Sequence, residues 1–540
     1  MNPDDPLIRR VSAINPVPDP EALGPEQRAA ADRLRALTTV TPRLPARRLR
    51  GSAWIRQTAM ALAIVVPVAA VLIVVLGVHH RSSINHGRGG SGVLHLPSAG
   101  KAQTLLLIGS DHRTGEPYSD ANTDAMMLVR LNPDAPTINL LSVPRDLEVR
   151  IPGGGTQKLN AVYSIGGPSL LLKILRTQVF PGLTVNHVID FDFQGFSRLV
   201  DALGCAYGDI DHRYINDTAQ TDYSSIDLEA GYQRLCGAQA LQFVRFRHTD
   251  TSLVRDARQQ DFLRWLSDDF TVGDLLSRRD RLLAIIGRYS QTDSGLHSVS
   301  GLLGLFDAAV KSAGHPFEQI PFPATLPRCP AGESCPFVTA TRGAEATAYR
   351  RFLATGPSPA SSSSAGTAHL GGSGRGDAVN LVQDVPDGQA QATALGAPGL
   401  PVYYPSLIVK SSRYCSDASG NCRVAPNPPS RYVNAYPRAY QIQAGGHRYP
   451  SYRMTLVLNA ALGQYYGVQG TTWSDPPILR HPTATQVVNG RQLREYGTGG
   501  ELSLVAFSTS TGTYWISNTL TDSIPNAQLI AIAASLRPAG

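Results

Sequence analysis

The chain has 540 residues, a hydrophobic share of 42% and a formal net charge of +7. This length exceeds what one compact core usually serves, so we expect two or three domains. The positive charge does not indicate nucleic-acid binding. Residues 1–57 hold ten Arg and six acidic residues, which places +4 of the +7 beside an apolar stretch. Basic residues in that position set the orientation of a membrane span, and we expect no nucleic-acid partner.

The N-terminal region has the pattern of a single membrane anchor. Residues 1–57 are rich in Pro, Ala and Arg and are expected to be cytoplasmic and largely disordered. Residues 58–78 carry no charge and match the about 20 residues that cross a bilayer as a helix. Arginines at 47, 48, 50 and 56 precede them, so the positive-inside rule places the C-terminal side outside the cell membrane. Residues 79–100 are then a spacer.

The remaining chain divides by composition into two domains and a linker. We expect a folded domain at 101–354 and a flexible Gly/Ser-rich linker at 355–394. A small α+β domain of unassigned role follows at 395–540. In it, residues 501–518 predict a hairpin and 525–537 a closing helix with Ser523 as its cap. Six aromatic residues there have either a core role, which we favour, or a sugar-stacking role: Tyr403, Tyr404, Tyr465, Tyr466, Trp473 and Trp515.

The six cysteines favour disulfides over a zinc site, because no CxxC pair or His cluster accompanies them. Cys329 and Cys335 lie close in sequence, as do Cys415 and Cys422. An even count with local pairs is typical of an oxidising compartment. Free buried thiols are the alternative.

Three apolar runs at 104–109, 125–131 and 137–143 predict buried strands, the last two joined as a hairpin by the turn NPDAP. If the first strand is also antiparallel to the second, Asp111, Asp124 and Arg145 lie at one end of the sheet. Two carboxylates and a guanidinium suit a divalent cation that holds a phosphate. The alternative is that these are solvated loop residues.

A second basic group follows at residues 240–260. The segment 240–250 (ALQFVRFRHTD) predicts a strand with Arg245 and Arg247 on one face. An amphipathic helix then opens with Arg255, Arg258 and Gln259. So many guanidinium groups favour an anion between them, because the Arg fork matches phosphate oxygens. A solvated basic face is the alternative.

Residues 169–180 and 191–204 predict apolar helices. The second carries an apolar stripe at helical spacing, which is more typical of plain core than of the wall of a lipid groove. Its members are Phe193, Phe196, Leu199, Val200 and Leu203.

Several motifs in order resemble the LytR–CpsA–Psr family of cell-wall ligases and cover most of residues 104–265. They are LLLIGSDHR (105–113), TDAMMLVRLNP (123–133), LLSVPRD (140–146), KLNAVYSIGG (158–167), HVIDFDFQGFSRLVDALG (187–204), GYQRLCGAQALQFVRFRH (231–248) and RDARQQDFL (255–263). The resemblance implies an α/β fold, an α-β-α domain with a central mixed sheet and an apolar pocket for a polyprenyl tail.

The resemblance also implies roles for site residues. Asp111 and Asp124 would be catalytic and would hold Mg²⁺ (or Mn²⁺). Arg145 would be catalytic and would bind the pyrophosphate. The rest of the phosphate cradle would be Arg245, Arg247, Arg255, Arg258 and Gln259. Asn122 stands where family members usually have Arg, and would contact phosphate without a charge. Cys205 and Cys236 match positions that actinobacterial members often join as a disulfide.

We therefore expect a Mg²⁺-dependent phosphotransferase that moves a glycopolymer from polyprenyl pyrophosphate to a peptidoglycan acceptor at the membrane. Asn122 motivates one alternative, a non-catalytic polyprenyl-pyrophosphate-binding regulator of the envelope. A pyrophosphatase or lipid hydrolase is another. The Ala/Arg/Pro-rich composition favours an actinobacterial source.

Overall fold

The computed structural model describes residues 101–539 except 113–117, 119–120, 217–224, 247–250, 270–276, short stretches between 279 and 316, 326–336, 356–379, 417–421 and 423–435. All of the described residues belong to one structural unit. The predicted cytoplasmic segment, membrane span and spacer (1–57, 58–78 and 79–100) lie outside the described residues. Within the described ranges, no helix combines the length and apolar character that a membrane crossing needs.

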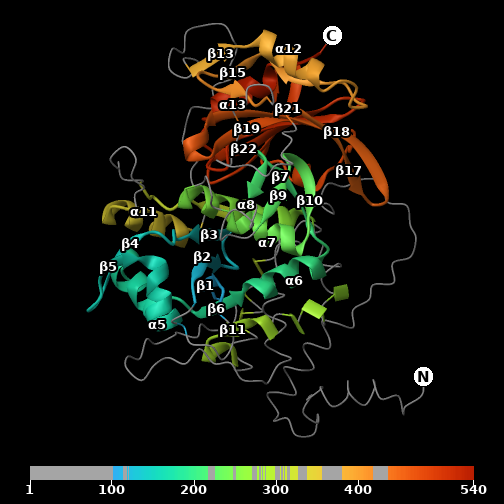
Figure 1. Ribbon diagram of the computed structural model, residues 1–540. Helices are drawn as coiled ribbons and strands as arrows, with labels where there is room; N and C mark the ends of the chain where they lie inside the picture. Colours follow the sequence, from blue (N-terminus) through green and yellow to red (C-terminus); the bar gives the residue numbers. More distant parts are fainter. Residues whose placement is uncertain are drawn as a thin grey trace, which may run out of the picture. The chain divides into compact units, whose positions relative to one another are not determined.

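A six-stranded mixed sheet forms the centre of the first domain, in the order β11-β6-β1-β2-β3-β12 (Figure 1). Its strands are β1 (Gln103–Ser110), β2 (Thr123–Leu131), β3 (Ile138–Ser142), β6 (His187–Asp192), β11 (Ser290–Thr292) and β12 (Phe317–Ile320). β2 pairs antiparallel with both β1 and β3, whereas β1–β6 and β3–β12 pair in parallel. The three predicted strands and the predicted hairpin are confirmed.

The two faces of this sheet bury separate apolar cores, because successive side chains of a strand point to opposite sides. Leu105 and Met127 belong to one core, and Leu106 and Leu128 to the other. The first face is covered by α6 (Phe193–Leu203), α7 (Gly237–Arg245) and α8 (Ser252–Asp269). The second is covered by α5 (Leu159–Ile174), its π-helical continuation Leu175–Val179 and α11 (Arg342–Leu353). The domain is thus the expected α-β-α arrangement around a mixed sheet.

The predicted helices 169–180 and 191–204 are present as the second half of α5 with its continuation, and as α6. α5 is kinked before its second half, where Gly167 has φ +60° and Pro168 follows. A side chain at 167 would be strained in this left-handed backbone. α6 begins at Asp192, whose carboxylate accepts a hydrogen bond from the Gly195 amide at 2.6 Å.

The predicted strand at 240–250 is wrong, since this segment contributes to helix α7. Ala240, Phe243 and Val244 are buried on one side of it, which is helical rather than alternate spacing. Phe246 leaves the helix with φ −56° and ψ 136°. The alternation of Phe and Arg at 243–247 was therefore too short to define a strand. Arg247 lies outside the described residues.

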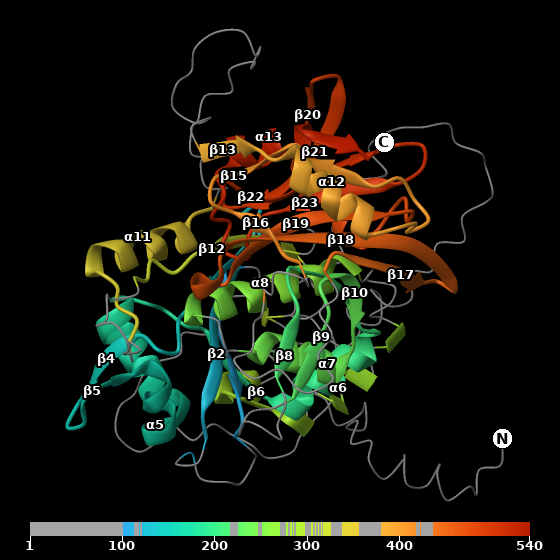
Figure 2. The same cartoon turned by 45° about the horizontal axis from the view of Figure 1, so that its top comes forward.

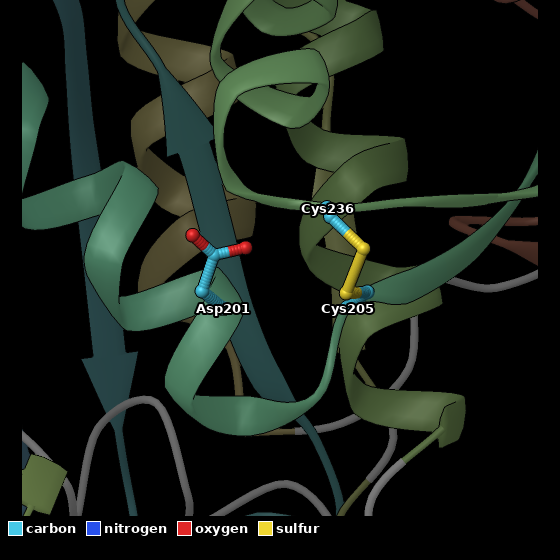
Figure 3. Close-up of side chains that lie close together, drawn as sticks. All are labelled: Asp201, Cys205 and Cys236. Atoms are coloured by element: carbon cyan, nitrogen blue, oxygen red, sulfur yellow. A yellow bond between two sulfur atoms is a disulfide. The ribbon is translucent and has the colours of Figure 1, made fainter.

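Short hairpins extend this domain: β4 (Glu148–Ile151) with β5 (Gly155–Lys158), β7 (Ala206–Ile210) with β10 (Gly231–Leu235), and β8 (Tyr214–Asn216) with β9 (Ile226–Leu228). A Cys205–Cys236 disulfide joins the segment before β7 to the start of α7 and confirms that expected pairing (Figure 3). Asp201 lies beside it and accepts a hydrogen bond from the Gly237 amide at 2.7 Å. Both sulfurs are used in the disulfide, so these three residues are not a metal site.

The C-terminal domain is built on a second sheet, in the order β16-β18-β19-β23-β22-β21-β20, with β17 also paired to β18. Its strands are β16 (Arg413–Tyr414), β17 (Arg438–Ala444), β18 (His447–Asn459), β19 (Gln464–Thr471), β20 (Ala484–Val488), β21 (Arg491–Thr498), β22 (Glu501–Ser508) and β23 (Thr513–Ser517). The predicted hairpin is β22–β23, and the predicted helix is α13 (Asn526–Ala534). Pro525 rather than Ser523 is its N-cap residue. The local Cys415–Cys422 disulfide is present, whereas Cys329 and Cys335 lie outside the described residues.

The predicted linker 355–394 ends earlier than expected. Residues 356–379 are outside the described part of the chain, but β13 (Leu381–Gln383) and α12 (Val385–Ala394) belong to the C-terminal domain. β13 pairs with β15 (Leu407–Val409), and β14 (Tyr403–Pro405) pairs with β24 (Leu536–Pro538). The Asp384 carboxylate caps α12 by accepting from the Asp387 amide at 3.3 Å. Of the six aromatic residues, Tyr404, Tyr465, Tyr466 and Trp515 are buried core.

The two domains share a buried polar contact and an apolar core. Asp209 on β7 accepts from Arg453 on β18 at 2.9 Å and from the Trp515 indole at 3.0 Å. Arg453 is fully buried. Around this contact, Phe262 and Leu266 of α8 lie in the same apolar cluster as Leu504 and Trp515. Figures 1 and 2 show α8 between the central sheet and the C-terminal sheet. The C-terminal domain is therefore part of the folded core around α8.

We predict that Asp209→Ala lowers the free energy of unfolding by about 3–5 kcal/mol, because it leaves a buried guanidinium without its counter-ion. Urea unfolding followed by tryptophan fluorescence measures this. The matched control is Asp475→Ala, whose side chain is 74% exposed and pairs with Arg480 at 3.8 Å, and which should change stability by less than about 1 kcal/mol. Equal effects of the two variants would show that Arg453 rehydrates without cost.

Three aspartic acids near the contact between the two domains are hard to ionise because they are buried. Burial raises the pKa of Asp268 to about 7 and the pKa of Asp269 to about 8 at the end of α8. Burial raises the pKa of Asp522 to about 8, and the neighbouring Asp261 raises it further against the attraction of Arg264. A carboxyl group whose pKa is higher in the folded state than its ordinary 3.8 stabilises the fold below pH 4. That contribution is lost as the pH rises towards 8.

We predict that the wild-type chain loses stability between pH 5 and pH 8.5, and that Asp522→Asn reduces this loss. Asn suits this position, because Asp522 has φ 48° and Asn tolerates the left-handed region. Thermal unfolding at several pH values provides the measurement. Asp475→Asn is the control and should leave the slope unchanged. The same slope in the Asp522→Asn and wild-type chains would contradict this assignment.

Candidate active site

An apolar cavity of about 190 Å³ lies between the central sheet and helices α6, α7 and α8. Leu105, Met127 and Ile189 contribute its floor from the strands. Its helical walls are formed by Phe193, Phe196, Leu199, Val200, Leu241, Val244, Phe262, Leu263 and Leu266. The stripe on α6, which we favoured as plain core, lines this cavity except at Leu203. The polar lining residues Asp124, Asp192, Arg245 and Gln259 adjoin the apolar walls.

Asp124 is the centre of the polar group beside this cavity. One of its carboxylate oxygens accepts from Arg145, and the other accepts from Arg245 at 3.0 Å. The Arg245 guanidinium also lies over the Phe193 ring at 4.0 Å, which joins the charged group to the apolar wall. Gln259 on α8 donates to the Val244 carbonyl at 3.2 Å. The structure therefore brings together four residues predicted separately from the sequence.

Asp111 lies at the same end of the sheet, one residue beyond β1. Its amide donates to the Asn122 carbonyl at 3.2 Å, and its carboxylate accepts from the Asn122 amide. Both side chains are exposed. Asn122 thus contacts Asp111 through its backbone, and this leaves its side-chain amide directed by no hydrogen bond in the described residues.

Arg145 and Arg255 lie close enough for their positive charges to repel each other, although each also has a carboxylate neighbour. Burial lowers the pKa of Arg145, and the neighbouring Arg255 lowers it further, while Asp124 and Asp146 act in the opposite direction. Arg255 is only 1% exposed and donates to Asp256 at 3.3 Å. In the described part of the chain, the Nε atoms of both arginines are buried without a hydrogen-bond partner. Two adjacent guanidinium groups with unused donors favour an anion as their third partner.

Arg258 does not belong to this group, contrary to the sequence prediction. It is fully buried, donates to the Phe246 carbonyl at 2.8 Å and lies over the Tyr214 ring at 4.7 Å. It holds the end of α7 against α8. Helical spacing placed it near Arg255, but no local pattern indicated its distant partner Tyr214.

The KLNAVY motif at 158–163, for which the sequence predicts no role, holds the backbone around Arg145 in place. The Asn160 amide donates to the Arg145 carbonyl at 2.9 Å, and Lys158 pairs with Asp146 at 3.0 Å. Tyr163 donates to Asp190, which also accepts from Ser110 at 2.7 Å. Burial raises the pKa of Asp190 to about 6, although both hydroxyl donors oppose the shift. This network fixes α5 to the ends of β1 and β6, next to Asp111.

We predict that substitution of two arginines that look alike in the sequence lowers the free energy of unfolding by very different amounts. Arg258→Ala should lower the free energy of unfolding by about 3 kcal/mol or more, because it leaves a cavity and a buried carbonyl without a donor. Arg145→Ala should cost less than about 1 kcal/mol, because Asp124 keeps Arg245 and the repulsion with Arg255 is removed. Urea unfolding of both variants tests the contrast. A larger loss in Arg145→Ala would make that residue structural.

Comparison with known proteins finds similarity in the first domain. Residues 77–335 match the model of the LytR_cpsA_psr family. A polyisoprenyl-teichoic acid–peptidoglycan teichoic acid transferase, TagU of Oceanobacillus iheyensis, is 29% identical over 210 residues, which are 37% of this chain and 62% of that protein. A probable cell wall biosynthesis protein, LcpB of Corynebacterium glutamicum, is 32% identical over 170 residues, or 29% of this chain and 39% of that protein.

Among solved structures, a LytR-Csp2A-Psr enzyme from Actinomyces oris is similar, with 21% sequence identity and a TM-score of 0.37. The match covers 47% of this chain and 94% of that one. The chain spans less than two thirds of the length of the curated relatives it matches.

Proposed function

We propose that this protein moves a glycopolymer from a polyprenyl-pyrophosphate carrier to peptidoglycan, in keeping with the match of residues 77–335 to the LytR_cpsA_psr family model. The observation that carries the proposal is the junction of an apolar cavity with clustered arginines around Asp124. The described residues thus offer one place for an isoprenoid chain and, directly beside it, one for its pyrophosphate. The teichoic acid transferase activity named for TagU agrees with this assignment.

The phosphate-binding part of the proposal rests on Arg145, Arg245 and Arg255. Asp124 occupies two of these guanidinium groups and so acts as an internal counter-ion. A pyrophosphate carries more charge than one carboxylate, and it would compete with Asp124 for the same donors. Arg255, with a buried and unused Nε, would then gain a partner.

In the proposed reaction, a peptidoglycan hydroxyl oxygen attacks the phosphorus next to the glycan. The bond from that phosphorus to the bridging oxygen breaks, and polyprenyl phosphate leaves with the electron pair. Arg145 and Arg245 stabilise the charge on the leaving phosphate. One of the two aspartates at this end of the sheet, Asp111 or Asp124, would accept the hydroxyl proton.

A bound Mg²⁺ or Mn²⁺ forms part of this proposal. Mg²⁺ in such sites takes one or two protein carboxylates, and substrate phosphate and water complete its ligands. Asp111 and Asp124 supply that number of carboxylates, with Asp124 releasing an arginine to the substrate. The ion would neutralise phosphate charge. Among the described residues, the one cluster of three ligand-type side chains contains the Cys205–Cys236 disulfide and does not compete for it.

We further propose that residues 58–78 anchor the chain in the cell membrane of an actinobacterium, with both described domains outside the cell. The charge-free sequence of that segment and the basic residues before it support this topology. The two disulfides of the described residues agree with an oxidising compartment. A carrier lipid in the same bilayer would then reach the cavity without leaving the membrane surface.

A non-catalytic pyrophosphate-binding regulator is the second candidate, and Asn122 is the observation that favours it. This residue replaces the arginine usual at its position and carries no charge. One phosphate contact of the family pattern is therefore missing here. Binding without turnover would follow if that contact is needed in the transition state.

We predict that the full chain in liposomes transfers sugar from a lipid-pyrophosphate-linked oligosaccharide to peptidoglycan fragments when Mg²⁺ is present. Arg145→Ala should reduce the rate at least about 100-fold, as expected for a lost transition-state contact. Arg480→Ala, a surface arginine of the C-terminal domain, is the matched control and should keep the wild-type rate. Mass spectrometry of the muropeptides and of the released lipid identifies the products.

The products also distinguish the transferase from the alternative functions. Sugar released into solution without a peptidoglycan adduct would indicate a hydrolase. Tight lipid binding without any product would support the regulator, and Asn122→Arg should then restore transfer. Transfer that persists in EDTA would remove the metal from the proposal and leave the arginines as the source of charge stabilisation.

A further inference from the structure

A second pocket lies on the C-terminal domain, on elements that the proposed active site does not use. It is lined by the start of β21, by the end of β22 and by Tyr403 of β14. The hairpin between β20 and β21 turns at Asn489 and Gly490, whose φ values are 52° and 75° (Figure 2). The cavity volume is about 490 Å³, within the range of about 300–1,000 Å³ common for small-molecule sites.

The charged groups of this pocket have one sign. Arg491 and Arg494 line it, together with Gln492, Ser508 and Thr509, and its described lining contains no Asp or Glu. Burial lowers the pKa of Arg491, and Tyr403 opposes the shift, but no carboxylate contributes. A partly buried guanidinium without a counter-ion gains most from an anionic ligand.

The structure holds both arginines in place without neutralising them. Arg491 lies over the Phe507 ring at 4.2 Å and donates to the Ala533 carbonyl at the end of α13 at 3.3 Å. Arg494 donates to the Ser508 hydroxyl at 2.8 Å. These neutral partners use some of the five N–H donors of each guanidinium and leave the rest for a ligand. The geometry is thus fixed before any ligand binds, which lowers the entropy cost of binding.

The uncharged lining indicates what carries the anionic group. Tyr403 is half-buried, and its ring is fixed by Phe507 at 5.4 Å and Tyr514 at 4.5 Å. A fixed aromatic ring suits the apolar C–H side of a sugar. The exposed amide of Gln492 suits sugar hydroxyls, since it offers both donors and an acceptor. A bare inorganic anion would use only the arginines.

We propose that this pocket binds a sugar that carries an anionic group, either phosphate or carboxylate, through Arg491 and Arg494. The inference goes beyond the proposed transfer reaction and does not depend on it. Arg494 holds the anionic group, Tyr403 packs against the ring, and Gln492 hydrogen-bonds its hydroxyls. An anionic glycan segment would then be retained on the C-terminal domain as well as at the catalytic domain.

The test is direct binding to the full chain in detergent micelles, by saturation-transfer NMR and calorimetry. The probes are glucose 6-phosphate, glucuronic acid and neutral glucose. We expect saturable binding of at least one anionic sugar, and at least tenfold weaker binding of glucose. Binding should weaken as the salt concentration rises, because charged groups in an open pocket are screened. The tighter of the two anionic probes identifies the group that the pocket accepts.

Two variants make the result specific to this pocket. Arg494→Gln removes one charge and should weaken binding at least tenfold. Gln492→Glu changes an exposed side chain, so it leaves the fold intact and adds a negative charge that should abolish binding. Arg480→Gln, an arginine outside the pocket, should bind like the wild type. Equal binding of glucose, no saturable signal, or unchanged binding in Gln492→Glu would each overturn the proposal.

Discussion

The antiparallel return of the chain through β1, β2 and β3 is the constraint on which the site depends. Each strand reverses the direction of the one before. The residue after β1, the start of β2 and the turn after β3 therefore lie at the same end of the sheet. Asp111, Asp124 and Arg145 occupy these three positions. The hydrogen-bond register thus assembles the charged group before any side chain interacts, and α5 then holds the Arg145 backbone in place through Asn160.

Helix α8 connects this group to the rest of the molecule. Its first turns carry Arg255 and Gln259 towards the charged group, and its middle supplies Phe262 and Leu266 to the apolar cavity. On its other side, Arg264 donates to Ser503 of the C-terminal sheet at 3.2 Å. One helix therefore contacts the anion-binding residues, the cavity and the second domain. A change in how the C-terminal domain packs would reach the site through α8.

The sequence predicted three of the six strands of the central sheet and the meeting of Asp124 with Arg145, because these depend on local patterns. Apolar runs bounded by turns marked β1, β2 and β3, and their order brought Asp124 and Arg145 together. What failed depended on distant contacts or on short patterns. Arg258 is buried by Tyr214, 44 positions away, and the Phe–Arg alternation of 243–247 concealed a helix. The start of the C-terminal domain had a usable signal, since Asp384 followed by Pro386 and Asp387 is typical of a helix N-terminus.

The ion pairs of Asp124 also have a consequence for product release. In the proposed reaction, a pyrophosphate would displace this carboxylate from Arg145 and Arg245, because it brings more negative charge and more oxygens. After transfer, the carrier keeps a single phosphate, and its advantage over the carboxylate shrinks. Asp124, tethered beside both guanidinium groups, then has the higher effective concentration and reclaims them. Under the proposed function, the residue that keeps the arginines ordered before the reaction would thus also favour release of the spent lipid after it.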